Sequence, residues 1–162
     1  MSRGRVWKYG DDVNTDVIFP GRYTYQIMEP AELAKHAMED LDPEFAKSVK
    51  PGDVIVAGKN FGCGSSREQA AACLRAAGVQ AVVAKSFARI YFRNAINLGL
   101  AVLQCAEAPD ALQTGDEVEI DFAGGRIISG DRVFRFFPLP DSVLGIIEAG
   151  GLIEYTKKKL RT

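Results

Sequence analysis

The sequence predicts a mixed α/β fold, with a βαβ core followed by an antiparallel β-meander, in a single domain spanning residues 1–162. In the middle third, short apolar runs typical of buried strands alternate with segments of helical periodicity. In the last third, three β-rich runs are joined by tight glycine turns. No repeat, linker or low-complexity segment interrupts this pattern, so a second domain is not expected.

The first 50 residues are predicted to hold one strand and one well-marked helix. Residues 5–9 alternate polar and apolar side chains, as a short strand does. Pro30 suits the first turn of a helix, and apolar side chains then repeat at helical spacing as far as Leu41. Pro43 ends that helix, because the residue before a proline avoids helical geometry. Residues 43–50 then form a short helical or irregular connection.

The middle third holds the βαβ core. Strands are predicted at residues 53–57, 81–84 and 101–104, and helices at 70–77 and 86–98. Gly78 and Gly99 end the two helices, since glycine is favoured just past a helix C-terminus. Ser86 is a candidate N-cap of the second helix.

The last third begins with one helical turn at residues 109–112. Three antiparallel strands are then predicted at residues 117–122, 126–129 and 132–136. A helix near residues 141–149 stops at the glycine pair 150–151, and a short basic tail follows.

Composition argues against several classes of partner. Twenty Lys and Arg residues stand against 21 Asp and Glu, and a net charge of −1 lacks the basic surplus on which nucleic-acid binding rests. No apolar stretch approaches the roughly 20 residues of a membrane span. The first residues also lack the apolar region of a signal peptide. The cytoplasm is therefore the expected compartment.

The cysteines and the one histidine argue against a metal site built by this chain alone. Cys63, Cys73 and Cys105 are widely spaced, and zinc or iron–sulfur sites need about four clustered soft ligands. Three buried, reduced thiols are the simpler interpretation. His36 lies off the apolar stripe of its helix and is expected to be solvated rather than a ligand. Any metal used here is expected to come from another chain.

The stretch "GKNFGCGSSREQA", residues 58–70, places a glycine-rich turn before a helix. It lacks the lysine of a Walker A loop, the last glycine of a dinucleotide fingerprint and the spacing of a nucleophile elbow. A helix N-terminus favours an anion, and Arg67 can hold a carboxylate through two parallel hydrogen bonds. A plain cap by Ser65 or Ser66, completed by Glu68, is the other interpretation.

Three motifs together resemble one family. "GKNFGCGSSREQA" is similar to the GxGSSRE loop of the small swivelling domain of the aconitase superfamily. "VVAKSFARIYFRNAINLGL", residues 82–100, resembles the segment of that domain that contains SFARI, and "GDDVNTDVIFPGRY", residues 10–23, resembles its TDxIxP segment. The motifs stand in the family's order and spread over residues 10–100, which is more than half of the chain. The fold implied is a single mixed β/α swivelling domain.

A free-standing chain of this length resembles the small subunits of 3-isopropylmalate dehydratases and homoaconitases. The resemblance implies a hydro-lyase that dehydrates and rehydrates a small hydroxy diacid, here 2- and 3-isopropylmalate in leucine biosynthesis. It also implies a large partner subunit that carries a [4Fe-4S] cluster on its own cysteines, with none bound by this chain. A non-catalytic module that only binds carboxylates is a third interpretation, which the intact serine and arginine motif disfavours.

The resemblance also assigns roles to residues. It implies that Ser65 is the base that removes the substrate proton, acting as an alkoxide, and that Ser66 and Arg67 bind a substrate carboxylate. Asp16 matches an active-site acid, expected near the cluster or its water. Arg89 and Arg93, at i and i+4 of one helix, are expected to donate structural ion pairs rather than to bind substrate.

Substrate choice is expected to depend on the loop after TDxIxP, where Tyr23 and Tyr25 stand. Family members that act on longer tricarboxylates often carry an arginine at the position of Tyr25. A tyrosine ring suits an isopropyl group better than a second carboxylate, which favours 3-isopropylmalate over homoaconitate. The neighbours Thr24 and Gln26 also depart from the common pattern, so a dimethylmalate-type dehydratase stays open.

Overall fold

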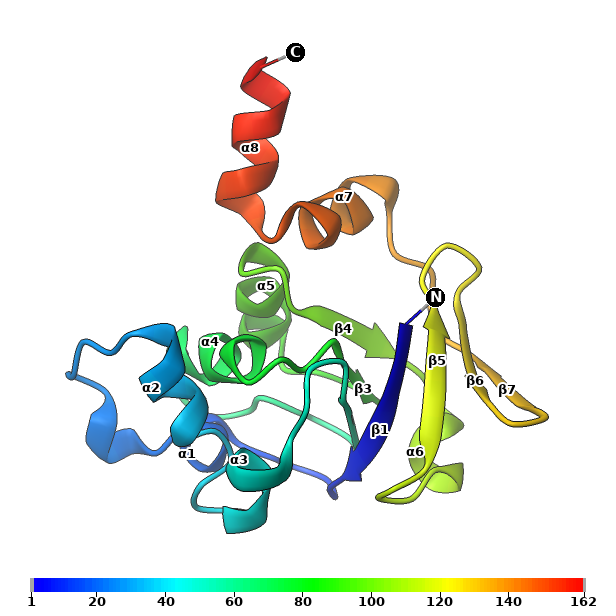
Figure 1. The fold of residues 1–162 in the computed structure, drawn as a ribbon, viewed down its shortest axis with the longest axis horizontal. Coiled ribbons are helices and arrows are strands. Elements are labelled where there is room, and N and C mark those ends of the chain that lie inside the picture. The colour runs from blue at the N-terminus through cyan, green and yellow to red at the C-terminus, as the bar shows by residue number, and fades with distance from the viewer. Residues whose placement is uncertain (1, 162) are drawn as a thin grey trace.

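The computed structural model describes residues 2–161 and contains one seven-stranded mixed sheet of strand order β4-β3-β2-β1-β5-β6-β7 (Figure 1). The strands are β1 (Ser2–Lys8), β2 (Val54–Ala57), β3 (Ala81–Ala84), β4 (Ala101–Gln104), β5 (Glu117–Asp121), β6 (Arg126–Ser129) and β7 (Arg132–Arg135). β1 to β4 run parallel, and β5 to β7 are antiparallel. The predicted α/β class, with its βαβ core and β-meander, is therefore confirmed.

β1 joins the two halves of the sheet. It pairs in parallel with β2, with Val6 opposite Val54, and antiparallel with β5, with Gly4 opposite Val118. Gly4 is required at this crossing, because a Cβ there would overlap the carbonyl of Gly52. The helices are α1 (Thr15–Ile18), α2 (Pro30–Lys35), α3 (Pro43–Ser48), α4 (Gln69–Ala76), α5 (Arg89–Asn97), α6 (Ala108–Ala111), α7 (Asp141–Ala149) and α8 (Leu152–Arg161), with a 3-10 turn at Gly21–Tyr23.

The central strands are covered on both faces, as parallel strands usually are. Every residue of β2 and β3 is buried. Ile55, Val82 and Val102 point to a core shared with α1, α4 and α5, whereas alternate residues of the same strands point to a second core under α6 and the meander. The continuous apolar runs in the sequence reflect this double burial.

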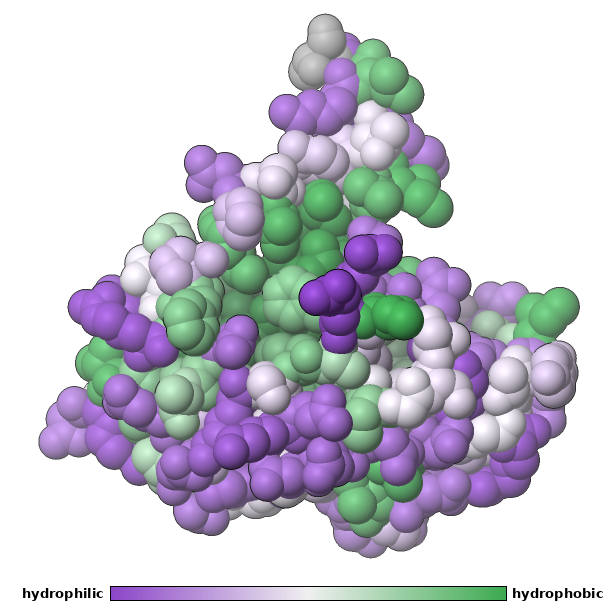
Figure 2. Space-filling view, turned by 180° about the vertical axis from the view of Figure 1, so that it is seen from behind, coloured by the Kyte–Doolittle hydropathy of each residue, from purple (hydrophilic) through white to green (hydrophobic). Residues whose placement is uncertain are grey.

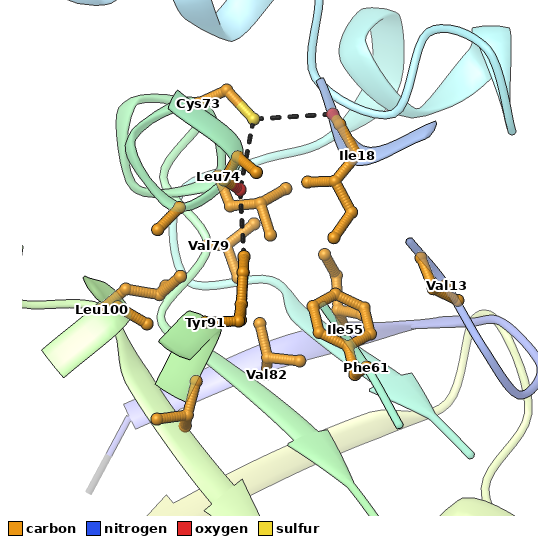
Figure 3. Close-up of a cluster of buried hydrophobic side chains, with 14 of the residues drawn as sticks. Val13, Ile18, Ile55, Phe61, Cys73, Leu74, Val79, Val82, Tyr91 and Leu100 are labelled. Atoms are coloured by element: carbon orange, nitrogen blue, oxygen red, sulfur yellow. Dashed lines mark hydrogen bonds between the residues drawn. The ribbon is translucent and has the colours of Figure 1, made fainter. Parts of the chain in front are cut away.

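The first core ties together the elements that carry the three motifs of the sequence (Figure 3). The Tyr91 hydroxyl of α5 donates a 2.9 Å hydrogen bond to the Ala70 carbonyl of α4, and the Cys73 thiol lies 3.6 Å from the Ile18 carbonyl of α1. Burial raises the pKa of Tyr91 well above its ordinary value, so this hydroxyl stays protonated and donates. α1, α4 and α5 are thereby held to one another.

The helix expected to reach Leu41 ends six residues earlier, at Lys35. The chain then turns inward, with Met38 at a φ of +60°. This turn also makes the expectation of a solvated His36 wrong. Its side chain is only 17% exposed, and its ring lies 4.2 Å from that of Tyr23. Beyond α2 the Met38 amide donates to the Ile18 carbonyl at 2.8 Å, so tertiary contacts replace the helical hydrogen bond there.

The basic tail, for which the sequence predicts no secondary structure, forms helix α8 over residues 152–161. This helix projects from the body of the protein and packs against α7 and α5 (Figure 1). Seen from behind, hydrophobic side chains gather where the projecting helix meets the body (Figure 2). On α8 itself the exposed large apolar side chains are Leu152, Ile153 and Leu160.

Two further expectations need correction. Cys73 and Cys105 are buried free thiols, but Cys63 is only half-buried. Ser86 does not cap α5, since Ala88 occupies the N-cap position, and the Ser86 hydroxyl instead accepts a 2.8 Å hydrogen bond from the Asn60 backbone amide. No helix within residues 2–161 is long and apolar enough to cross a membrane.

Candidate functional site

Three segments far apart in the sequence meet at the glycine-rich loop. The Gly62 amide donates to the Val13 carbonyl at 2.8 Å, and the Thr15 amide donates to the Cys63 carbonyl at 2.9 Å. On the other side, the Ala88 amide donates to the Phe61 carbonyl at 2.9 Å. Backbone hydrogen bonds therefore hold the loop between the segments that carry the TDxIxP and SFARI motifs.

The loop takes its shape from two glycines. Gly62 and Gly64 have φ values of +83° and +94°, which glycine adopts at little cost. Gly62 also lies directly against Tyr91, where a Cβ would overlap the side chain. Both glycines are needed to bring the chain over α5 and to turn it toward α4.

Ser65 and Ser66 follow this turn, with exposed side chains. The Thr15 hydroxyl donates a 2.8 Å hydrogen bond to the Ser65 carbonyl and so holds the backbone there. Neither serine hydroxyl has a hydrogen-bond partner within residues 2–161. The alternative interpretation, a plain cap by Ser65 or Ser66, is wrong, because α4 begins at Gln69 with Glu68 at the N-cap and no side-chain cap. Both hydroxyls are thus available to a ligand.

Arg67 lies just before α4, not in its first turn, and it is engaged by the protein itself. Its Nη2 donates to Asp16 Oδ1 at 2.9 Å, to the Thr15 carbonyl at 2.8 Å and to the Phe19 carbonyl at 2.7 Å. Its Nη1 donates to the Thr24 hydroxyl at 3.0 Å. Only 9% of the side chain is exposed. The buried Nε has no partner among the described residues.

A cleft of about 280 Å³ opens beside these residues. Its lining consists of Thr15, Gly62, Gly64, Ser65, Ser66, Arg67, Ala88, Arg89, Ile90, Tyr91 and Asn94. The volume lies just below the usual range for small-molecule sites, roughly 300–1,000 Å³. The lining contains hydroxyls, two arginines and no acidic side chain, which suits a small anion.

The structure brings Ser65, Ser66 and Arg67 to one cleft and places Asp16 against Arg67. It does not bring the two tyrosines there. Tyr23 stacks on His36, and Tyr25 is 99% exposed in the loop after α1. That loop is nevertheless joined to the site, because the Gln69 side-chain amide donates to the Thr24 carbonyl at 3.0 Å.

The expectation that Arg89 and Arg93 donate ion pairs is wrong for the described part of the chain, where neither has an acidic partner within 4.0 Å. Arg89 instead lines the cleft, which i,i+4 spacing alone could not reveal. Thr15 and Thr24 were also missed, because their roles depend on partners more than 40 residues away. Within residues 2–161, no group of three or more His, Cys, Asp or Glu side chains could hold a metal ion.

Comparison with known proteins gives a consistent result. Residues 21–108 match the family model of the aconitase C-terminal domain. A protein of Archaeoglobus fulgidus named 3-isopropylmalate dehydratase small subunit 1 is 56% identical over 156 residues, covering 95% of this chain and 96% of that protein. The small subunit of Caldicellulosiruptor saccharolyticus is 52% identical, covering 98% of this chain and 92% of that protein. A crystal structure of 3-isopropylmalate dehydratase from Methanocaldococcus jannaschii is similar with a TM-score of 0.90 and 47% identity, covering 97% and 93% of the two chains.

Proposed function

Because this chain belongs to the family of 3-isopropylmalate dehydratase small subunits, we propose that it is the small subunit of such a hydro-lyase. The reaction interconverts 2- and 3-isopropylmalate by dehydration and rehydration, a step of leucine biosynthesis. The observation that carries the proposal is the cleft in which two serine hydroxyls without protein partners stand beside a buried arginine. The whole chain, residues 1–162, acts as one domain in this proposal.

Ser65 is the proposed base. A proton beside a carboxylate is poorly acidic, so its removal needs a strongly basic group that is held in position. The Ser65 hydroxyl makes no competing hydrogen bond, while the Thr15 hydroxyl holds its backbone. A serine alkoxide is feasible only where cations and backbone amides stabilise it. The arginines of the cleft and the glycine-rich turn support that role.

Ser66 and Arg67 are proposed to bind the substrate, and Asp16 is proposed to act near the partner's cluster or its water. The Ser66 hydroxyl has no protein partner within residues 2–161 and can donate to a substrate carboxylate, and the guanidinium of Arg67 lines the same cleft and adds positive charge beside it. Asp16 pairs with Arg67 through Oδ1, and its side chain is 66% exposed. The outward-facing part of this carboxylate is therefore available to the half of the active site that the partner supplies.

The partner is proposed to be a large subunit that carries a [4Fe-4S] cluster. The cluster would be held by the cysteines of the large subunit and would supply Lewis-acid chemistry toward the departing hydroxyl. The open cleft and the exposed Asp16 support a site that a second chain completes. The free cysteines fit a reducing compartment, and we place the complex in the cytoplasm.

The test of this function is the variant Ser65→Ala in the complex assembled with the large subunit. Loss of the base should lower kcat by about 100-fold or more, with a much smaller change in KM. Ser142→Ala, an exposed serine of α7, is the matched control and should leave both constants unchanged. Near-normal turnover by Ser65→Ala would remove this residue from the mechanism.

The substrate is tested by comparing 3-isopropylmalate, homoaconitate and dimethylmalate with the same complex in steady state. The exposed ring of Tyr25 favours a substrate with a branched alkyl group, since the ring offers apolar area and no positive charge. A higher kcat/KM for 3-isopropylmalate is expected. A higher kcat/KM for homoaconitate would contradict the role in substrate choice proposed for the loop that carries Tyr25.

A further inference from the structure

We propose that Arg89 is a second carboxylate-binding residue of this site and takes the carboxylate that Arg67 does not hold. The inference rests on the proposed function, because it requires a substrate with two carboxylates. Arg89 then binds substrate, whereas its position in the sequence predicts that it donates a structural ion pair.

Arg67 alone cannot serve both carboxylates. Its two terminal nitrogens already donate to four protein acceptors, which leaves Nε as the nitrogen without a partner. The side chain is more than nine-tenths buried, so it cannot swing to reach a second group. Its positive charge is also balanced by Asp16, whose carboxylate lies 2.9 Å from Nη2.

Arg89 has the opposite character. It lines the same cleft, is exposed, and has no ion pair or hydrogen bond from its side chain within residues 2–161. The cleft lining contains no acidic residue, so the charge of Arg89 is the one left unbalanced there. An unpaired guanidinium facing a cleft is well suited to bind a carboxylate through two parallel hydrogen bonds.

The N-terminus of α5 adds to the positive electrostatic potential of the cleft. Arg89 is the first residue of α5, a helix of nine residues, and Ala88 at the N-cap offers no side chain to satisfy the amides of the first turn. The positive end of the helix dipole therefore lies at the cleft. Arg89 and the first turn of α5 therefore provide a place for negative charge in the same cleft as Ser65, Ser66 and Arg67.

The test uses Arg89→Gln and Arg89→Lys in the assembled complex, with Arg93→Gln as the matched control. Arg93 is exposed on the same helix, also lacks an ion pair in the described residues, and does not line the cleft. Loss of a charged hydrogen-bond pair should raise KM for 3-isopropylmalate roughly 10- to 100-fold in Arg89→Gln. The change in kcat should be smaller, Arg89→Lys should be intermediate, and Arg93→Gln should be unchanged.

A binding measurement makes the test independent of turnover. The dissociation constants of succinate and of its monoamide are measured by calorimetry on the same complexes. The wild-type complex should prefer the diacid, and Arg89→Gln should lose most of that preference, which a merely structural role would not change. If the wild-type complex is inactive on 3-isopropylmalate, the proposed function fails, while the succinate measurement still decides the role of Arg89.

Two results would overturn the inference. One is an unchanged KM and an unchanged preference for succinate in Arg89→Gln. The other is a loss of activity that excess large subunit restores in full, with KM unaltered, because Arg89 would then serve the subunit interface rather than the substrate.

Discussion

The contact between Gly62 and Tyr91 sets the position of the serine loop, and Gly62→Ala tests it. A Cβ on Gly62 would overlap Cβ and Cγ of Tyr91 and lie 2.7 Å from Cδ1. Rotation of the tyrosine side chain cannot move its own Cβ. Either the loop or α5 must therefore shift to accept one methyl group.

The expected cost has two parts. Holding alanine at a φ of +83° costs about 1–2 kcal/mol. Inserting a methyl group into a well-packed region costs roughly 1–3 kcal/mol more. The sum, about 2–5 kcal/mol, is a large part of the free energy of unfolding of a typical domain, which is roughly 5–15 kcal/mol. For a chain of this size it lowers Tm by roughly 5–15 °C.

Two other glycines distinguish the conformational cost from the packing cost. Gly115 has a φ of +96° but nothing within 4 Å of a built Cβ, so Gly115→Ala should show only the conformational cost of about 1–2 kcal/mol. Gly10 has neither positive φ nor a close neighbour, and Gly10→Ala should be nearly neutral. Thermal and urea unfolding of the purified chains measures all three. Equal losses in Gly62→Ala and Gly115→Ala would refute the close approach to Tyr91.

Other perturbations have smaller, distinct outcomes. Tyr25→Arg should leave Tm unchanged, since the side chain is 99% exposed. It should raise kcat/KM for substrates with an additional carboxylate. An unchanged ranking of the substrates would contradict a role of this loop in substrate choice. Tyr91→Phe should lower the free energy of unfolding by about 1 kcal/mol in urea titrations, because the hydrogen bond to the Ala70 carbonyl is lost. Burial and the hydrogen bond to Asp42 raise the pKa of Tyr9, so the unfolded chain loses this proton first. Stability should therefore fall as pH rises above about 10, and less steeply in Tyr9→Phe.

The sheet was largely predictable because its signals are local. Residues 81–84 and 101–104 are apolar without interruption, which is typical of strands buried on both faces, and both strands have the predicted bounds. The meander strands carry period-two patterns between glycine turns, and residues 126–129 were likewise predicted with the observed bounds. In these segments the side-chain pattern and the tertiary structure favour the same conformation.

The remaining differences come from contacts that a local pattern does not contain. α2 stops at Lys35 although the apolar spacing continues to Leu41, and the chain beyond it makes tertiary contacts: His36 packs against Tyr23, and the Met38 amide donates to the Ile18 carbonyl. Residues 152–161 are rich in lysine, yet they form a helix that packs against α7. In the site, the glycines predicted the turn, but the serines could not be distinguished from helix caps until the start of α4 at Gln69 was known.

The engaged state of Arg67 explains how half of an active site can be kept ready before a partner completes it. Its acceptors all come from residues 15–24, and Gln69 adds a further hydrogen bond to Thr24. The serine loop and the loop that carries Tyr25 are therefore held as one body, and their groups keep a fixed spacing. Groups that need no rearrangement on binding lose less entropy when the substrate arrives. The consequence is that Thr24→Val, which removes one acceptor of a buried guanidinium, should impair together the proton removal proposed for Ser65 and the substrate choice proposed for Tyr25, seen as a lower kcat and a changed ratio of kcat/KM between 3-isopropylmalate and homoaconitate.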